Sequence, residues 1–142
     1  MKSKDDISKS MRAIKSVSNV ETVFAKKLYK VGIRYRRNNR DIQGKPDISI
    51  KKYKLAIFID GEFWHGKDWE IQKNKIKSNR DYWIPKIEKN IQRDALTNRI
   101  LEENEWKVFR FWSRDLSKRT DEYINLIKKY IQEYGRRNDK IH

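Results

Sequence analysis

The feature that most limits how this chain can fold is an uninterrupted apolar run, Leu55 to Ile59, in a sequence whose charged residues make up 39% of the total. A strand with one face in water alternates apolar and polar side chains, whereas a continuous apolar run is typical of a strand buried on both faces. Such a strand needs packed layers on both sides of its sheet. The run therefore predicts an α/β fold in which a central sheet is flanked by helices.

Hydrophobic spacing and turn residues predict the elements around this strand. A short turn at Lys51–Tyr53 predicts an antiparallel hairpin, and the crossover through a long helix predicts a parallel, right-handed strand pair. Segment 67–80 is polar and basic, and we expect it to be irregular. The expected order is helix, three strands, helix, strand and helix, over residues 18–31, 33–36, 46–51, 54–60, 82–103, 106–112 and 120–134.

Individual residues indicate where the helices begin and end. Ser18 and Glu21 have the spacing of a capping box, and Gly32 lies just past the end of the same helix. Pro85 is tolerated in the first turn of the long helix. Gly135 is expected to end the last helix, which leaves residues 136–142 as a frayed tail.

The length of 142 residues suits one domain with one core, so we expect residues 1–142 to form a single domain. Residues 1–17 are polar and basic with isolated apolar side chains, which predicts a mobile arm that orders on binding. The chain has no cysteine, which excludes disulfides and thiolate metal sites. We find neither a long apolar stretch nor a signal-peptide pattern, and therefore expect a cytoplasmic protein that does not bind membranes.

The net charge is +15, from 35 Lys and Arg against 20 Asp and Glu. A small domain this basic usually binds a polyanion, most often a nucleic acid, with strongly salt-dependent affinity. Charge alone does not separate DNA from RNA, although the signature of an RNA-stacking sheet is missing. The side chains that we expect to contact phosphates are Lys9, Arg12, Lys15, Lys89, Asn90 and Arg93, each of which could equally be solvated.

Two acidic residues and one histidine are candidates for metal binding and for general base catalysis. Asp47 begins one hairpin strand and Asp60 ends the other, so both are expected at one edge of the sheet, where oxygen ligands suit Mg²⁺. His65 follows in a loop, where it could act as a general base on water, and the adjacent Phe63 and Trp64 could stack on bases. Taken singly, the two aspartates fit ordinary turn residues and the histidine fits a solvated one.

Several segments, in order, resemble the very short patch repair (Vsr-like) endonucleases, a family whose catalytic core also occurs in some homing endonucleases. The resemblance spans about Ser8 to Leu116, and its most specific part is the FWH loop combined with the N-x-x-R-D helix. It implies a restriction-endonuclease-like core of the PD-(D/E)XK type, which agrees with the element order predicted above. The segments are SMRAI at 10–14, VE at 20–21, GKPD at 44–47, IFIDGEFWHG at 57–66, WIPKI at 83–87, KNIQRD at 89–94 and WKV at 106–108.

The resemblance also implies roles for individual residues. Asp47 and the backbone carbonyl of Ile59 would bind a catalytic Mg²⁺, and Glu21 would support the waters around it. His65 would activate the attacking water, with Asp94 orienting the imidazole and stabilising its charge. Each residue also has a structural interpretation: Glu21 as a cap of its helix, and Asp94 as a surface partner of Arg93, Lys89 or Asn98.

Recognition in the family uses side chains that enter the base stack. The resemblance places Phe63 and Trp64 in one groove of the DNA, and Met11 and Ile14 of the arm in the other. Because a mismatched step costs least to unstack, wedges of this kind favour mismatches. The alternative for Met11 and Ile14 is a helix packed on the protein's own core.

The sequence departs from the family at the structural zinc site. The corresponding positions carry Glu62, Lys67, Trp69 and Arg114, a set that does not suit Zn²⁺. We therefore predict no zinc, and we expect Glu62 with Arg114 or Lys67, together with packing of Trp69, to anchor the loop.

The function predicted from the sequence is Mg²⁺-dependent nicking of duplex DNA at a T:G mismatch in a short sequence context. The expected enzyme is a bacterial, nucleoid-associated monomer that is functionally paired with a cytosine-5 DNA methyltransferase. Two alternatives stay open: a homing or restriction-type endonuclease with another DNA target, and a DNA-binding module without catalysis.

Overall fold

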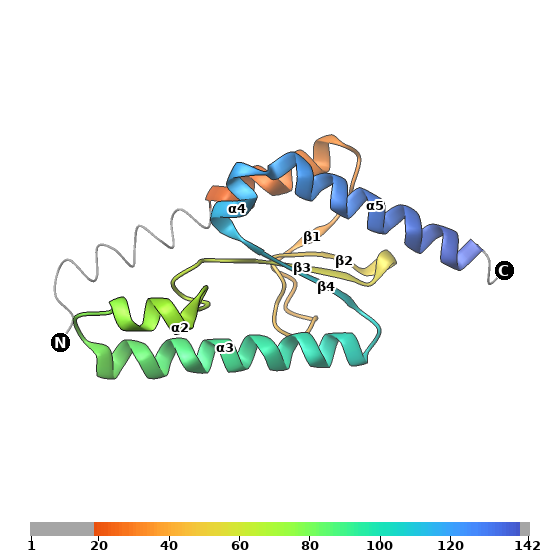
Figure 1. Cartoon of the computed structure of the whole chain (residues 1–142). Helices are drawn as coiled ribbons and strands as arrows, with labels where there is room; N and C mark the ends of the chain where they lie inside the picture. The colour runs from red at the N-terminus through yellow and green to blue at the C-terminus, as the bar shows by residue number, and fades with distance from the viewer. Residues whose placement is uncertain (1–18, 140–142) are drawn as a thin grey trace.

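The computed structural model describes residues 19–139, the side chain of Asp139 excepted, and shows three layers with a sheet in the middle (Figure 1). The sheet order is β1-β2-β3-β4, in which the first two pairs are antiparallel and β3 and β4 are parallel. This confirms the mixed four-stranded sheet, the hairpin and the parallel pair. The strands are β1 (Arg36–Arg37), β2 (Ile48–Ile50), β3 (Leu55–Asp60) and β4 (Lys107–Trp112).

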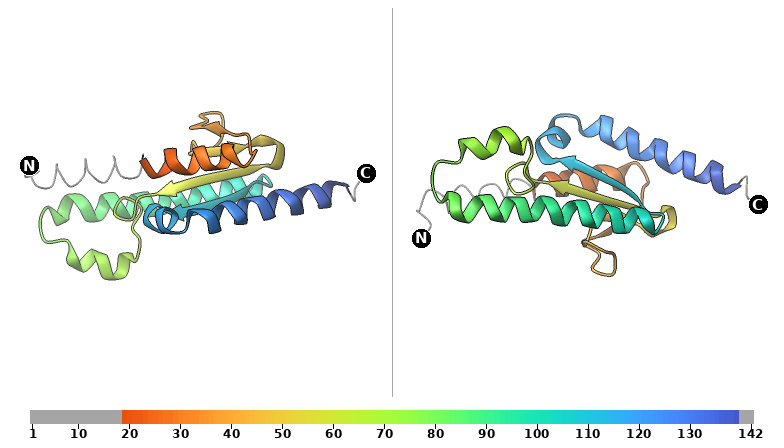
Figure 2. Two further views of the ribbon diagram at one scale, coloured as in Figure 1. Left: turned by 90° about the horizontal axis from the view of Figure 1, so that it is seen from above. Right: turned by 60° about the horizontal axis from the view of Figure 1, so that its bottom comes forward.

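Helices cover both faces of the sheet, as the views in Figures 1 and 2 show. One face carries the helix over residues 19–30 together with α4 and α5, and the other carries α3 with α2 beside it. None of the helices between residues 19 and 139 is both long and apolar enough to cross a bilayer. The bounds are α2 (Trp69–Gln72), α3 (Arg80–Glu103), α4 (Ser113–Lys118) and α5 (Thr120–Asp139), with single 3-10 turns η1 (Lys51–Tyr53) and η2 (Lys73–Lys75).

Strand β3 is buried along its whole length, as its apolar run predicts. Its odd-numbered side chains, including Ile57, join the core formed with the helix over 19–30, α4 and α5. Its even-numbered side chains, including Phe58, join a second core with Leu101 of α3. Each fully buried aliphatic side chain contributes roughly 2 kcal/mol, so this strand is a main source of stability.

The same alternation places the last residue of β3. Successive side chains of a strand point to opposite faces, so Asp60 lies on the α3 side of the sheet, like Phe58. In the parallel register Phe58 pairs with Arg110 of β4. A carboxylate from β3 and a guanidinium from β4 are thereby brought to the face that α3 covers.

The structure corrects several predicted boundaries. Gly135 does not end α5, which continues to Asp139, because a helical glycine costs about 1 kcal/mol without breaking the backbone hydrogen bonds. Part of the tail predicted at 136–142 is therefore helical. Helix α3 begins at Arg80, so Pro85 lies in its second turn and not in its first.

The sequence-based prediction was also wrong for the short helices and for the first strand. Segment 67–80, expected to be irregular, contains α2 and η2, and α4 follows β4 directly. The first strand is limited to Arg36–Arg37 and excludes the apolar residues predicted to begin it. The arm at 1–17, with Lys9, Met11, Arg12, Ile14 and Lys15, and the capping residue Ser18 lie outside the described residues.

Candidate active site

His65 and Asp94 form a close pair at the end of the sheet. The loop after β3 carries His65, and α3 carries Asp94, with 2.5 Å between the imidazole Nδ1 and the carboxylate Oδ2. Since Nδ1 faces Asp94, Nε2 is the nitrogen available to another group, and it has no hydrogen-bond partner within residues 19–139. The pair is the arrangement in which a carboxylate fixes the tautomer and orientation of a histidine base.

Arg110 is a member of this site that the sequence analysis missed. Its Nη1 lies 3.1 Å from Asp60 Oδ2 and 3.7 Å from Asp94 Oδ1. Its Nε donates to Asn98 Oδ1 at 2.6 Å, and the guanidinium lies 4.1 Å from the centroid of the Phe58 ring. One cation thus holds two carboxylates that face the histidine.

Asp60 completes the group, with its Oδ1 3.7 Å from His65 Nδ1. One ligand atom from each of Asp60, His65 and Asp94 lies within 4.8 Å of the others, so the three residues could hold a metal ion. Arg110 already supplies positive charge to both carboxylates, which makes a second cation there less favourable.

The environment shifts the pKa values of these groups in opposite directions. Burial lowers the pKa of His65, but the hydrogen bond with Asp94 and the charge of Asp60 outweigh it and raise that pKa above 6.5. Burial opposes ionisation of Asp94, yet the hydrogen bond and charge of His65 bring its pKa below 3.8. Burial raises the pKa of Asp60 in spite of the nearby His65 and Arg110. The His65–Asp94 pair is therefore stabilised in its charged form.

A second acidic cluster lies beside the first. Asp47 Oδ2 accepts a hydrogen bond from the backbone N–H of Ile59 at 2.6 Å, and Glu21 of the first helix lies against Asp47. Burial and the charge and hydrogen bond of Asp47 raise the pKa of Glu21 to about 8, and Arg37, 3.6 Å away, opposes the shift. At neutral pH the Glu21 carboxyl therefore favours its protonated form beside Asp47. Two half-buried carboxylates whose negative charges repel each other suit a hard divalent cation such as Mg²⁺.

The two clusters meet at the end of β3. Ile59 holds Asp47 through its backbone, and the next residue, Asp60, faces His65. Since consecutive residues are about 3.8 Å apart along the chain, the two clusters adjoin. Of the five positions named from the sequence, the structure places Glu21, Asp47 and Ile59 in one cluster and His65 and Asp94 in the adjoining one. Glu21 contacts Asp47 and Arg37, and its predicted capping interaction with Ser18 lies outside the described residues.

The aromatic residues of the loop form a cluster with α3. Phe63, Trp64 and Trp83 have ring centroids 5.2 to 5.5 Å apart, and Phe63 is 42% exposed. The indole Nε1 of Trp64 is buried and has no hydrogen-bond partner within the described part of the chain. Trp83 is the member that the sequence analysis did not assign to the site, although its position one turn into α3 beside the aromatic loop could have indicated it.

Two contacts fix the path of this loop. Asn90, predicted as a phosphate contact, donates through Nδ2 to the carbonyl of Trp64 at 2.9 Å, while Lys89 and Arg93 on the same helix are exposed. Gly66 has φ +69°, and a Cβ there would lie 2.4 Å from Ile91 Cδ1. Glycine at this position therefore permits both the left-handed backbone and the close approach to α3.

Comparison with known proteins identifies the family. A family profile described as "DNA mismatch endonuclease Vsr" matches residues 1–71. A relative from Haemophilus parainfluenzae, "Type II nicking enzyme V.HpaIIP", is 54% identical over 113 residues, which cover 80% of each chain. The chain belongs to the Vsr family. A second relative, "Type II nicking enzyme V.NmeDIP" from Neisseria meningitidis serogroup C, is 52% identical over 80% of this chain and 76% of its own length.

The "DNA mismatch endonuclease Vsr" of Escherichia coli strain K12 is 33% identical over 122 residues, 82% of this chain and 77% of its own. These relatives confirm the resemblance found in the sequence, the restriction-endonuclease-like fold and the assignment as a DNA endonuclease.

The four positions at which the Vsr resemblance places zinc ligands do not fit a zinc ion. Lys67 and Arg114 carry cations, and the indole N–H of Trp69 donates to Glu88 Oε2 at 3.4 Å. The remaining candidate, Glu62, already accepts hydrogen bonds from the Ser113 hydroxyl at 2.6 Å and the backbone N–H of Arg114 at 3.1 Å. One carboxylate with both oxygens engaged is not a tetrahedral zinc site.

The loop anchor differs from the one predicted. We expected Glu62 to pair with the side chain of Arg114 or Lys67, whereas it binds Ser113 and the backbone of α4. Lys67 pairs instead with Asp115, at 3.5 Å. In this member of the Vsr family, hydrogen bonds to the start of α4 therefore hold the aromatic loop.

We expect Glu62→Ala to lower the free energy of unfolding by about 2 kcal/mol, because two hydrogen bonds to a charged acceptor are lost. Thermal melts would measure the change, with Glu70→Ala on exposed α2 as the matched control. The wild-type melting temperature should not respond to a strong zinc chelator. One tightly held zinc per chain in elemental analysis, or equal melting of Glu62→Ala and the control, would contradict this anchor.

Proposed function

We propose that this Vsr-family endonuclease uses Mg²⁺ to nick duplex DNA at a T:G mismatch within a short sequence. The observation that carries the proposal is the meeting, at the end of β3, of a histidine–carboxylate pair and a pair of crowded carboxylates. The first pair suits proton transfer, and the second suits a divalent cation.

His65 is the proposed general base. Asp94 holds Nδ1, so Nε2 is left to accept a proton from the water that attacks the phosphodiester. The imidazolium formed in this step is stabilised by Asp94 and Asp60, the same groups that raise the pKa of His65. Arg110 keeps both carboxylates in place during the transfer.

Asp47 is the proposed protein ligand of the metal, with the Ile59 carbonyl beside it and Glu21 supporting the site. When bound, Mg²⁺ would supply positive charge for the phosphate and the departing oxygen. The N–H of Ile59 fixes the Asp47 carboxylate at the end of β3, so this ligand needs little reorganisation. A cation bound at Asp47 would favour the ionised form of Glu21, which would then support the site with its negative charge.

Mismatch preference is assigned to the aromatic loop. Phe63 is exposed and backed by Trp64 and Trp83, which gives a rigid apolar wedge beside the proposed base. Trp64 is proposed to enter the base stack with Phe63, where its indole N–H, which has no partner within residues 19–139, would gain a hydrogen bond. A mismatched step is the least costly to open, so wedge insertion favours it. A cytosine-5 methyltransferase is the proposed functional partner, because deamination of its product creates T:G pairs.

The test is strand-resolved cleavage of end-labelled duplexes that differ only in one base pair. With Mg²⁺ we expect a nick in one strand of the T:G duplex, about 100-fold faster than in the matched duplex, because unstacking favours the mismatch by a few kcal/mol. In EDTA, which removes Mg²⁺, we expect no cleavage. Equal cleavage of the two duplexes would contradict mismatch recognition, and undiminished cleavage in EDTA would contradict the metal.

A second candidate is sequence-specific nicking of duplexes without a mismatch. The observation in its favour is that relatives more than half identical to this chain are named type II nicking enzymes. Cleavage of the matched duplex as fast as the T:G duplex in the same assay would favour this candidate.

A further inference from the structure

The molecule has a cavity that the proposed chemistry does not use. Its volume is about 680 Å³, within the usual size of a ligand site, and it opens beside the loop that carries His65. Phe63 and Gly66 of that loop line one side, and segment 67–78 lines another. Since His65 lies between Phe63 and Gly66 in the chain, an occupant of the cavity would adjoin the proposed base.

The rim of the cavity is positively charged. It is lined by Lys67, Lys75, Lys77 and Arg114, against the acids Glu62 and Asp68. Glu62 is already engaged by Ser113 and α4, and Lys67 is paired with Asp115. The side chains of the other three cations have no carboxylate at ion-pair distance within residues 19–139.

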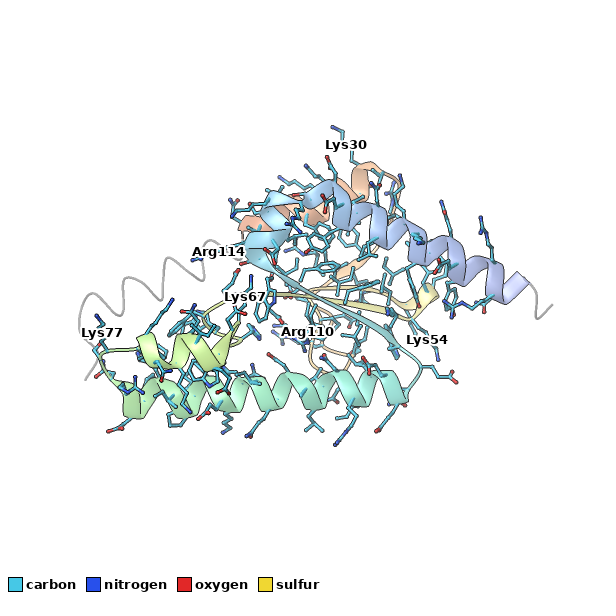
Figure 3. All side chains as sticks on the ribbon, in the orientation of Figure 1. Lys30, Lys54, Lys67, Lys77, Arg110 and Arg114 are labelled. Carbon is cyan, nitrogen blue, oxygen red and sulfur yellow. The ribbon has the colours of Figure 1, made fainter. Side chains whose placement is uncertain are left out.

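These cations come from two sides. Figure 3 shows Lys67 before α2 and Lys77 beyond η2, at opposite ends of this helical segment, with Arg114 across from them at the start of α4. Lys54, by contrast, lies at the other end of the sheet, where it pairs with Glu105. Positive charge thus surrounds the opening next to the active site.

Between the cations, the lining is aromatic. Phe63, Trp69 and Trp83 contribute to the walls. Cations around a cavity disfavour a metal ion, and aromatic faces suit the sugars and bases of a nucleic acid better than the side chains of an acidic peptide. The lining therefore fits a strand of DNA.

We propose that this cavity, termed the cationic pocket (Phe63, Lys67, Trp69, Lys75, Lys77, Trp83, Arg114), binds sugar-phosphate backbone of the DNA substrate beside the scissile phosphate. The phosphates contact Lys75, Lys77 and Arg114, and the sugars lie against Trp69 and Trp83 beside the base step that Phe63 enters. This inference rests on the proposed function only in taking the duplex to be nicked as the ligand.

The test compares two variants that each lose three positive charges. The pocket variant carries Lys75→Gln, Lys77→Gln and Arg114→Gln, and the remote variant carries Lys30→Gln, Lys128→Gln and Lys129→Gln, all at exposed positions. Binding of a fluorescein-labelled T:G duplex is measured by anisotropy over a range of salt. We expect the pocket variant to bind about 10- to 100-fold more weakly, with a salt slope reduced by about 2 to 3, and the remote variant to change by less than about threefold.

Methylphosphonate substitutions then locate the contact. In the wild type, neutralising phosphates beside the scissile position should weaken binding, and in the pocket variant the same substitutions should have no further effect. The proposal would be overturned if the pocket variant and the remote variant lost the same affinity for DNA. It would also be overturned if methylphosphonates weakened binding equally in the pocket variant and in the wild type. Nicking of the T:G duplex by the wild type, measured alongside, reports on the proposed function separately.

Discussion

Replacing His65 with alanine should slow nicking by about 10³-fold and leave DNA affinity unchanged within about twofold. The imidazole is the proton acceptor proposed at this site, and Asp94 and Asp60 are arranged to stabilise its charged form. Single-turnover nicking of the T:G duplex measures the chemical step, and anisotropy measures binding. A rate within tenfold of the wild type would remove His65 from the proposed chemistry.

The pH dependence separates a base from a residue that only supports the loop. A base must be neutral, so the wild-type rate should fall about tenfold per pH unit below the pKa of His65, which lies above 6.5. In Asp94→Asn the negative charge that strengthens the hydrogen bond and raises this pKa is lost, while burial and Arg110 still lower the pKa and only Asp60 still raises it. The acid limb should therefore shift to lower pH, while the plateau falls about 100-fold because the tautomer is no longer fixed. An acid limb that stays in place would show that another group titrates.

The elements that build the site could be predicted because their signals are long and local. The apolar run of β3 requires burial on both faces, and α3 is a single helix of 24 residues. Short elements carry too few residues for a period: α2 has four residues and α4 has six. At Gly135 a strong local signal gave a wrong prediction of a helix end, since a glycine is compatible with a helix that tertiary contacts stabilise.

The partners within the site depend on contacts that sequence spacing does not encode. Arg110 is one of 35 basic residues, and only the parallel register of β3 and β4 places it beside Asp60. Glu62 finds its donors in Ser113 and Arg114, about fifty residues away, once α4 packs against the loop. Ionisable residues could be identified from the sequence as a set, but their pairing is a property of the folded chain.

Asp47→Asn should abolish Mg²⁺-dependent nicking, with a loss of about 10³-fold or more, because a metal that polarises phosphate contributes several kcal/mol to the barrier. The amide can still accept the hydrogen bond from the Ile59 N–H, so the end of β3 should keep its structure. The matched control is Asp41→Asn in an exposed loop. A variant that nicks as fast as the control would exclude Asp47 as the ligand.

Although Asp47→Asn should abolish nicking, it should stabilise the protein when no metal is bound. Glu21 has a pKa of about 8 in the folded state, against an ordinary value of 4.5, so the folded state holds an extra proton between these two pH values. Stability therefore falls as pH rises through this window. Removing the charge of Asp47 lowers the pKa of Glu21 and weakens this decline, which should raise the melting temperature in EDTA at about pH 8.5 by roughly 3 °C. Mg²⁺ should stabilise the wild type, which it binds in the folded state, and the variant much less. Melting curves with equal Mg²⁺-induced shifts in wild type and Asp47→Asn would place the cation elsewhere, with the Asp60–His65–Asp94 group as the next site to test.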